Sequence, residues 1–298
     1  MSNTSKELLA SLRQQHRELL ERYNPDSCIE SLDRVAESDS YHKIPDDVIA
    51  TWLAVRSDFG RIGFEAFQKI TLASLIDNFE IRSREHKYTD SVRQCYTKSY
   101  DRIIKSISDP DFSNYCEDND ALKKDLGLCR QKLFPAGAQV VEAGSSFHRA
   151  MMFRDGIKQA LAMLSLLCRS GDNKNWYQIH THLGELDDFN PDGWNKCYIR
   201  LADMMELDTN VRGIWGGSWF YDPILDTISP RLSYLREVPQ NNGAFVLYSN
   251  IDLNGGALSK SESRKTAHDN GEYVPKSYAM IWLRKDILKW ASTMRDAD

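Results

Sequence analysis

The 298-residue chain lacks most of the short patterns that identify an enzyme or a metal protein from its sequence. It contains neither a G-x-G-x-x-G nor a G-x-x-x-x-G-K-[ST] segment, so nicotinamide, flavin and P-loop nucleotide binding have no support. No two of its six cysteines stand in a C-x-x-C pair, and their wide scatter favours reduced thiols over a disulfide framework. Function must therefore be inferred from weaker signals.

Long apolar runs and an excess of one charge are also missing. No stretch of about 18 uncharged apolar residues occurs, so we expect no membrane span. The first residues contain no apolar signal region, so we expect a cytoplasmic protein. The formal net charge of −5 divides into −3 over residues 1–136 and −2 over the remainder. Neither half has the basic excess that nucleic-acid binding requires, so no nucleic-acid partner is expected.

Glycine and tryptophan are unevenly distributed along the chain. Only three of the 16 glycines, Gly60, Gly63 and Gly127, precede residue 137, whereas six of the seven tryptophans follow residue 175. Glycine permits backbone conformations that other residues avoid, and tryptophan favours half-buried positions where its N–H finds a partner. The sequence therefore predicts a helical domain over residues 1–170 and a mixed α/β domain over residues 171–298.

Apolar residues of the first half recur at helical spacing. Pro25 is expected to end the first helix, and Phe134 to Gly137 to form a turn. In the last helix, Ile157, Leu161 and Leu164 are predicted to pack inward. The predicted helices cover about residues 5–24, with a capping box at Thr4 and Glu7, and about residues 46–55, 62–84, 89–108, 120–133 and 147–168.

The periodicity changes after Gly171. Apolar and polar residues alternate, or aromatic and β-branched residues gather, over segments that predict strands at residues 176–183, 211–221, 231–238, 244–251 and 277–283. Further helices are predicted at residues 192–207, 261–270 and 285–294. This order predicts an α+β fold, with a helical N-terminal bundle or cap packed on a mixed α/β C-terminal sheet.

The strongest local signal is His180-Thr181-His182. Residues i and i+2 of a strand project from one face, about 6–7 Å apart. Two imidazoles at that separation can share a divalent transition metal, with a carboxylate such as Glu185 as third ligand. On a polar sheet face the same histidines can instead act as bases or bond to neighbouring groups, so both interpretations stay open.

The stretch after these histidines resembles two metal-binding patterns. The two histidines followed by Asp187 and Gly193 resemble the first cupin motif, although Lys174 stands where that motif has a glycine. Asp188-x-Asn190-x-Asp192 resembles the opening of an EF-hand loop, but its twelfth position is Ile199 rather than a carboxylate. An Asx turn at a helix start explains the second pattern without calcium.

The stretch from Gly213 to Pro223 is the most unusual in the chain. Its paired glycines indicate a bulge or a close approach of backbones. Trp215 and Trp219, at an even spacing, are predicted to share one strand face. They either wall a ligand pocket, with Ser218 and Asp222 as polar contacts, or pack beneath the N-terminal helices.

From residue 176 onward the order of elements resembles the acetyltransferase fold of the GNAT superfamily. Residues 263–273, which include Arg264, correspond in this resemblance to the late helix and turn near the acyl-CoA sulfur. The resemblance implies acyl-CoA as cofactor and group transfer with a histidine as base, although the family's pyrophosphate-binding Q/R-x-x-G-x-G/A loop is absent. The candidate bases are His180, His182 and His268.

Three functional classes follow, and we favour the first because polar and aromatic residues converge in the glycine-rich half. The first is a transferase that moves an acyl or related group between small molecules. The second is a metal-dependent enzyme with the ligands His180, His182 and Glu185. The third is a non-catalytic protein whose tryptophan surface binds a protein partner or a second copy. The predicted substrate-binding residues are Trp215, Ser218, Trp219, Asp222, Arg231 and Arg264.

Overall fold

The computed structural model describes residues 3–36, 39–79, 86–109, 115, 120–253 and 256–296, so Cys116 and the predicted helix end near Arg84 lie outside the described residues. The chain divides into two compact units, one of Met1–Glu142 with Thr181–Leu186 and the other of Ala143–His180 with Asp187–Asp298. The polypeptide therefore returns to the first unit for one short segment after it has entered the second.

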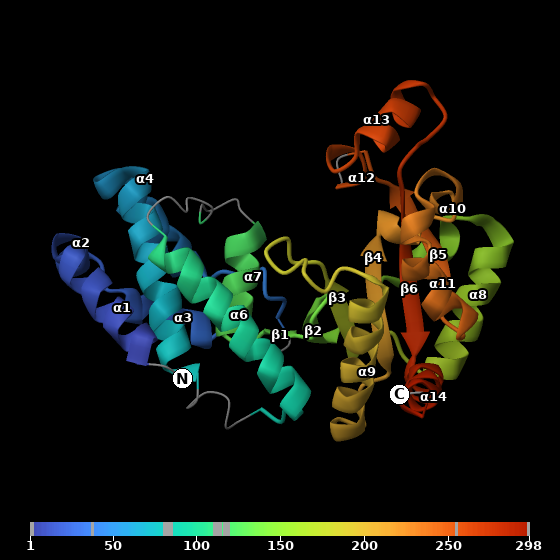
Figure 1. The fold of residues 1–298 in the computed structure, drawn as a ribbon, viewed down its shortest axis with the longest axis horizontal. Helices are drawn as coiled ribbons and strands as arrows, with labels where there is room; N and C mark the ends of the chain where they lie inside the picture. The colour runs from blue at the N-terminus through green and yellow to red at the C-terminus, as the bar shows by residue number, and fades with distance from the viewer. Residues whose placement is uncertain are drawn as a thin grey trace. The chain divides into compact units, whose positions relative to one another are not determined.

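The α+β class expected from the sequence is confirmed, with a helical N-terminal region and one mixed sheet (Figure 1). The sheet order is β1-β2-β3-β4-β6-β5, with β3 parallel to β4 and the pairs β1–β2, β4–β6 and β5–β6 antiparallel. The strands are β1 (Leu133–Pro135), β2 (Val140–Ser145), β3 (Trp176–His180), β4 (Gly213–Ser218), β5 (Phe245–Ile251) and β6 (Lys276–Leu283).

The helices of the first unit pack around its longest member. They are α1 (Asn3–Gln15), α2 (Arg17–Arg22), α3 (Pro25–Asp33), α4 (Asp46–Asp77), α6 (Asp90–Ser108) and α7 (Asp120–Cys129). Helix α4 joins two helices that the sequence predicts separately, with a kink at Gly60, whose φ of 66° favours glycine. The predicted inward residues Phe64, Phe67 and Ile70 are buried, which confirms that face of the helix.

Helices of the second unit pack against both faces of the sheet. Strand β6 shows this, because the side chains of its neighbouring residues point to opposite faces. Ile281 shares a core cluster with Met163 of α8, whereas the ring of Trp282 lies 5.3 Å from those of Tyr198 in α9 and Trp290 in α14. The helices of this unit are α8 (Gly156–Ser170), α9 (Pro191–Leu207), α10 (Leu225–Ile228), α11 (Tyr234–Asn241), α12 (Gly256–Ser259), α13 (Glu262–Asp269) and α14 (Arg284–Arg295).

Several predictions of secondary structure are wrong, and residues 231–238 and 133–145 differ most from them. Residues 231–238 are not a strand: a short 3-10 turn, Pro230–Leu232, leads into α11. Leu235 and Pro239, four residues apart, are buried together on one helical face, a spacing that also suits this sequence. The opposite error occurs at residues 133–145, where a predicted helix end and turn are instead the hairpin of β1 and β2, paired from Leu133–Glu142 to Pro135–Val140.

Helix α8 presents its predicted inward face to solvent. Ile157, Leu161 and Leu164 are 73%, 58% and 49% exposed. Gln159 and Met163 are buried instead, since the helix is apolar on two faces and the sheet covers only one of them. Periodicity identified the helix correctly but not the face that it buries.

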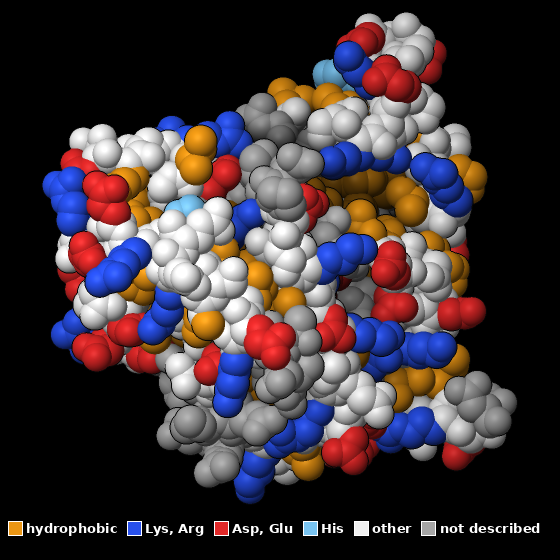
Figure 2. Space-filling model, turned by 60° about the vertical axis from the view of Figure 1, so that its left-hand side comes forward, with side chains coloured by type: hydrophobic (Ala, Val, Ile, Leu, Met, Phe, Trp, Pro, Cys, Tyr) orange, Lys and Arg blue, Asp and Glu red, His pale blue; other side chains and the backbone are white. Residues whose placement is uncertain are grey.

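Charged side chains of both signs are interspersed over the face drawn in Figure 2. Within the described ranges, no helix is long and apolar enough to cross a membrane.

Candidate functional site

The two histidines of the strongest sequence signal do not share a strand face, so that prediction is wrong. Strand β3 ends at His180, and His182 lies beyond it, in the segment that returns to the first unit. His182 is 2% exposed; its Nδ1 accepts the N–H of Gly184 at 3.0 Å and its Nε2 lies 2.9 Å from Asp125 Oδ1. The first bond requires an unprotonated Nδ1, so Nε2 carries the proton and both ring nitrogens are engaged.

His182 belongs to a buried polar network around Asp125. Arg102 donates two hydrogen bonds to the Asp125 carboxylate, at 3.1 and 2.5 Å, and Tyr115 Oη donates a third at 2.9 Å. Burial opposes ionisation of Asp125, but the bonds from His182 and Arg102 outweigh it and hold its pKa below the ordinary value. Glu185 accepts from Arg102 at 3.0 Å. The network therefore fixes the returning segment within the first unit.

A metal site at these residues has no support in the geometry. Over the part of the chain that the structure describes, no three His, Cys, Asp or Glu side chains are arranged to hold an ion. Glu185, proposed as the third ligand, is engaged by Arg102. Asn190 accepts the N–H of Gly193 at 2.9 Å and caps α9, as the alternative to a calcium loop predicted. The third candidate base, His268, has its Nδ1 2.8 Å from the carbonyl oxygen of Tyr273.

The tryptophans of the glycine-rich stretch also separate. Strand β4 ends at Ser218, whose hydroxyl accepts the N–H of Phe220 and starts a 3-10 turn, so Trp215 and Trp219 do not share a strand face. Trp215 packs against the core cluster beneath α8, and Trp219 belongs to another cluster with Leu225. The shared strand face predicted from their spacing is therefore wrong.

Several predicted substrate-binding residues nevertheless gather in the second unit, around Arg264. Its guanidinium carbon lies 4.4 Å from the ring centroid of Trp219, and Arg264 is 3% exposed. Its Nε donates to the carbonyl oxygen of Ala257 at 2.7 Å and its Nη1 to Ser229 Oγ at 3.2 Å. Burial lowers its pKa, and the positive charge of Arg231 acts in the same direction.

Asp222 and Tyr273 complete this group, which we call the Arg264 cluster. Asp222 Oδ2 and Tyr273 Oη are buried without a hydrogen-bond partner among the described residues. Burial raises the pKa of Asp222, and burial together with the nearby Asp222 charge raises the pKa of Tyr273 to about 12. The sequence indicated Asp222 and Arg264 but gave no reason to consider Tyr273.

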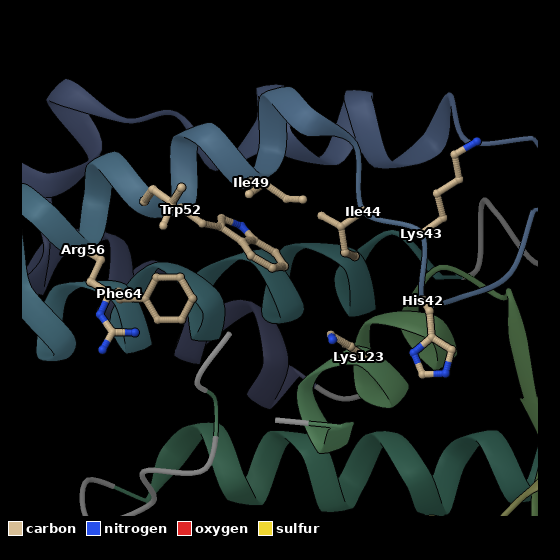
Figure 3. A pocket seen from close by; sticks show the side chains of 9 residues that line it. His42, Lys43, Ile44, Ile49, Trp52, Arg56, Phe64 and Lys123 are labelled. Carbon is tan, nitrogen blue, oxygen red and sulfur yellow. The ribbon is translucent and has the colours of Figure 1, made fainter. Parts of the chain in front are cut away.

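A pocket in the first unit offers a different site, which the sequence analysis missed. It lies between the segment before α4, the first half of α4 and the start of α7, with a volume of about 420 Å3 (Figure 3). That volume suits a small molecule. Its apolar lining residues are Ile44, Ile49, Trp52, Leu53 and Phe64, and its basic lining residues are His42, Lys43, Arg56 and Lys123.

Two aromatic rings form the interior of this pocket, which we call the helical pocket. Trp52 and Phe64 are 5% and 2% exposed, with ring centroids 6.0 Å apart in an edge-to-face arrangement. The indole N–H of Trp52 has no hydrogen-bond partner among the described residues. Ile49 and Leu53 stay 41% and 60% exposed because they form an open wall rather than core. An apolar stripe too wide to be buried was the sequence signal for this site.

The basic side chains stand at the two ends of the helical pocket. Figure 3 shows Arg56 beside Phe64 at one end, and His42 and Lys123 at the other. Lys43 points away and pairs with Asp39 at 2.8 Å. None of the described lining residues is acidic. The lining therefore favours a ligand with an apolar body and a negative group.

No protein-family model, curated protein or solved structure matches the chain.

Proposed function

We propose that the protein binds a small organic anion in the helical pocket. The apolar or aromatic body of the ligand lies against Trp52 and Phe64, and its carboxylate or phosphate lies at Arg56 or Lys123. One observation carries this proposal: a pocket of about 420 Å3 combines a buried aromatic interior with basic ends and, among the described residues, no acidic lining residue.

The charges should determine which ligands bind. An apolar body gains from leaving water whatever its charge, so the aromatic interior alone does not separate an acid from its neutral analogue. A charge-assisted hydrogen bond from Lys123 or Arg56 adds about 1.5–3 kcal/mol. That amount corresponds to roughly a 10- to 100-fold preference for the anion.

Calorimetric titration with 1-naphthoate and 1-naphthamide tests the proposal, because the two probes share a ring system and differ in charge. We expect 1-naphthoate to bind at least about tenfold more tightly than 1-naphthamide. Equal affinities, or no saturable binding of 1-naphthoate, would contradict the proposal.

Substitutions locate the binding. Lys123→Gln and Arg56→Gln should weaken 1-naphthoate binding and leave 1-naphthamide binding nearly unchanged. Lys105→Gln is the matched control, since Lys105 is exposed on α6 and does not line the pocket. If Lys105→Gln weakens binding as much as Lys123→Gln, the anion binds elsewhere.

Group transfer in the second unit is our second proposal, supported by the Arg264 cluster. A buried carboxyl whose pKa is raised keeps its proton to higher pH, which suits a general acid, and Asp222 fits that role better than the engaged His182. A saturable rise in the melting temperature with acetyl-CoA, reduced in Asp222→Asn, is expected. The absence of any rise in the wild-type protein contradicts this second proposal.

A further inference from the structure

A second pocket, in the second unit, has a different lining. Its volume is about 450 Å3, and it lies where the end of α8, the loop from α9 to β4 and the start of α14 meet. Basic side chains provide much of the lining: Arg169, Arg212, Arg284 and Lys285. No acidic side chain lines it among the described residues. We call it the basic pocket.

Backbone carbonyl groups hold two of its guanidinium groups in place. Arg284 Nη1 donates to the carbonyl oxygen of Asp208 at 3.0 Å, and Arg212 Nη1 donates to that of Ser170. A Cβ atom on residue 171 would lie 3.1 Å from Arg212 Nη1, so Gly171, with φ of 78°, leaves the space that this contact needs. Each guanidinium has five N–H donors, so these contacts fix its position and leave donors for a ligand.

A backbone hydrogen bond also links Arg212 and Arg284. Strand β6 runs directly into α14 (Figure 1), and the N–H of Arg284 donates to the carbonyl oxygen of Arg212 at 2.8 Å. Arg169 is held from outside the lining by Asp286, at 2.6 Å. Lys285 is exposed, and Thr209 also lines the pocket. The three arginines are therefore positioned before any ligand arrives, which lowers the entropy cost of binding.

We propose that the basic pocket binds the phosphate or diphosphate group of a small phosphorylated molecule. Asp286 offsets the charge of Arg169, which leaves Arg212, Arg284 and Lys285 as the cationic lining. Three such side chains would be excessive for one carboxylate, whereas a phosphate carries close to two negative charges at neutral pH and offers several acceptor oxygens. Fixed guanidinium groups suit such oxygens because their N–H groups pair with two oxygens at once. This site goes beyond the anion of the helical pocket and shares no residue with it.

Calorimetric titration of the full chain with inorganic pyrophosphate tests this site, with citrate as a polyanion built from carboxylates. Saturable binding of pyrophosphate with a dissociation constant below about 1 mM is expected. Citrate should bind at least about tenfold more weakly. Higher salt should weaken the binding of pyrophosphate. No saturable binding of pyrophosphate, or equal binding of citrate, overturns the proposal.

Thr209→Glu places a carboxylate in the lining without removing any guanidinium contact, and it should weaken pyrophosphate binding at least about tenfold. Lys289→Gln, one turn farther along α14 and outside the lining, is the control and should change binding less than about twofold. Unchanged binding in Thr209→Glu, with an unchanged melting temperature, overturns the proposal. Lys123→Gln should bind pyrophosphate normally, which separates this test from that of the helical pocket.

Discussion

Replacing Asp125 by Asn tests the buried polar network that holds His182. The substitution keeps the size of the side chain but removes its charge and one acceptor. Arg102, whose side chain is 20% exposed, then keeps Glu185 as its one carboxylate partner among the described residues. Removing one partner of a buried ion pair costs about 3–5 kcal/mol, and the remaining Glu185 places the expected loss near 3 kcal/mol.

The matched control is Asp101→Asn, on α6 next to Arg102. Asp101 is exposed, so its loss should cost less than about 1 kcal/mol. Because two units can unfold separately, backbone amide exchange in α6 and α7 is the appropriate assay, alongside urea denaturation. Asp125→Asn should lower the protection of both helices, whereas Asp101→Asn should leave it nearly unchanged.

The pH dependence of the same variant has a definite sign. The pKa of Asp125 lies below its ordinary value, so its contribution to stability is complete above about pH 4, the pKa of an unperturbed Asp, and is lost as the pH falls through the folded-state pKa. The gap in stability between wild type and Asp125→Asn should therefore narrow in acid. A stability loss below about 1 kcal/mol at pH 7, or a difference between the two proteins that does not change with pH, would show that the Asp125 carboxylate does not stabilise this network.

Three further predictions concern the second unit, each checked by thermal denaturation. Gly213→Ala should destabilise the protein by about 4 kcal/mol or more, because φ is +153° and the new Cβ would lie 2.2 Å from a carbonyl oxygen of β6. Gly217→Ala is the control: its Cβ would enter open space, so it should cost less than about 1 kcal/mol. Similar losses in the two variants would contradict this prediction. Because the pKa of Asp222 is raised, ionisation of its carboxyl group lowers the stability of the protein as the pH rises above about 4. Asp222→Asn should therefore raise the melting temperature at pH 7 and lose that advantage in acid. A lower melting temperature of Asp222→Asn at pH 7 would contradict this prediction. Ile157→Glu and Leu161→Glu should each change stability by less than about 1 kcal/mol because the two residues are 73% and 58% exposed, and a larger loss would place them in a core.

The sequence predicted the fold class and most helices because apolar spacing records which side chains are buried together. It failed where two periods fit one segment. Residues 231–238 suit a strand by alternation and α11 by the burial of Leu235 with Pro239. In α8 both faces are apolar, so spacing did not show that Met163 would be buried and Leu161 exposed. In such segments, the surface against which the segment packs determines its secondary structure and the face that it buries.

The sites were harder to predict because they join residues that are distant in sequence. The sequence suggested that His182 acts together with His180. In the structure, Asp125, 57 positions away, accepts a hydrogen bond from the Nε2–H of His182. The helical pocket likewise brings Lys123 to residues 42–64. Arg264 and Asp222 were identified from local chemistry, but their relation to Tyr273 needed the folded chain.

The indole N–H signal of Trp52 provides the most direct test of the claim that the helical pocket binds an organic anion. It can be assigned in a 15N-labelled protein by its absence from Trp52→Phe and followed as 1-naphthoate is added. We expect this signal to shift in a saturable manner, and Lys123→Gln to require roughly tenfold more ligand for the same shift. A Trp52 signal that stays in place while 1-naphthoate binds would show that the anion does not occupy the helical pocket.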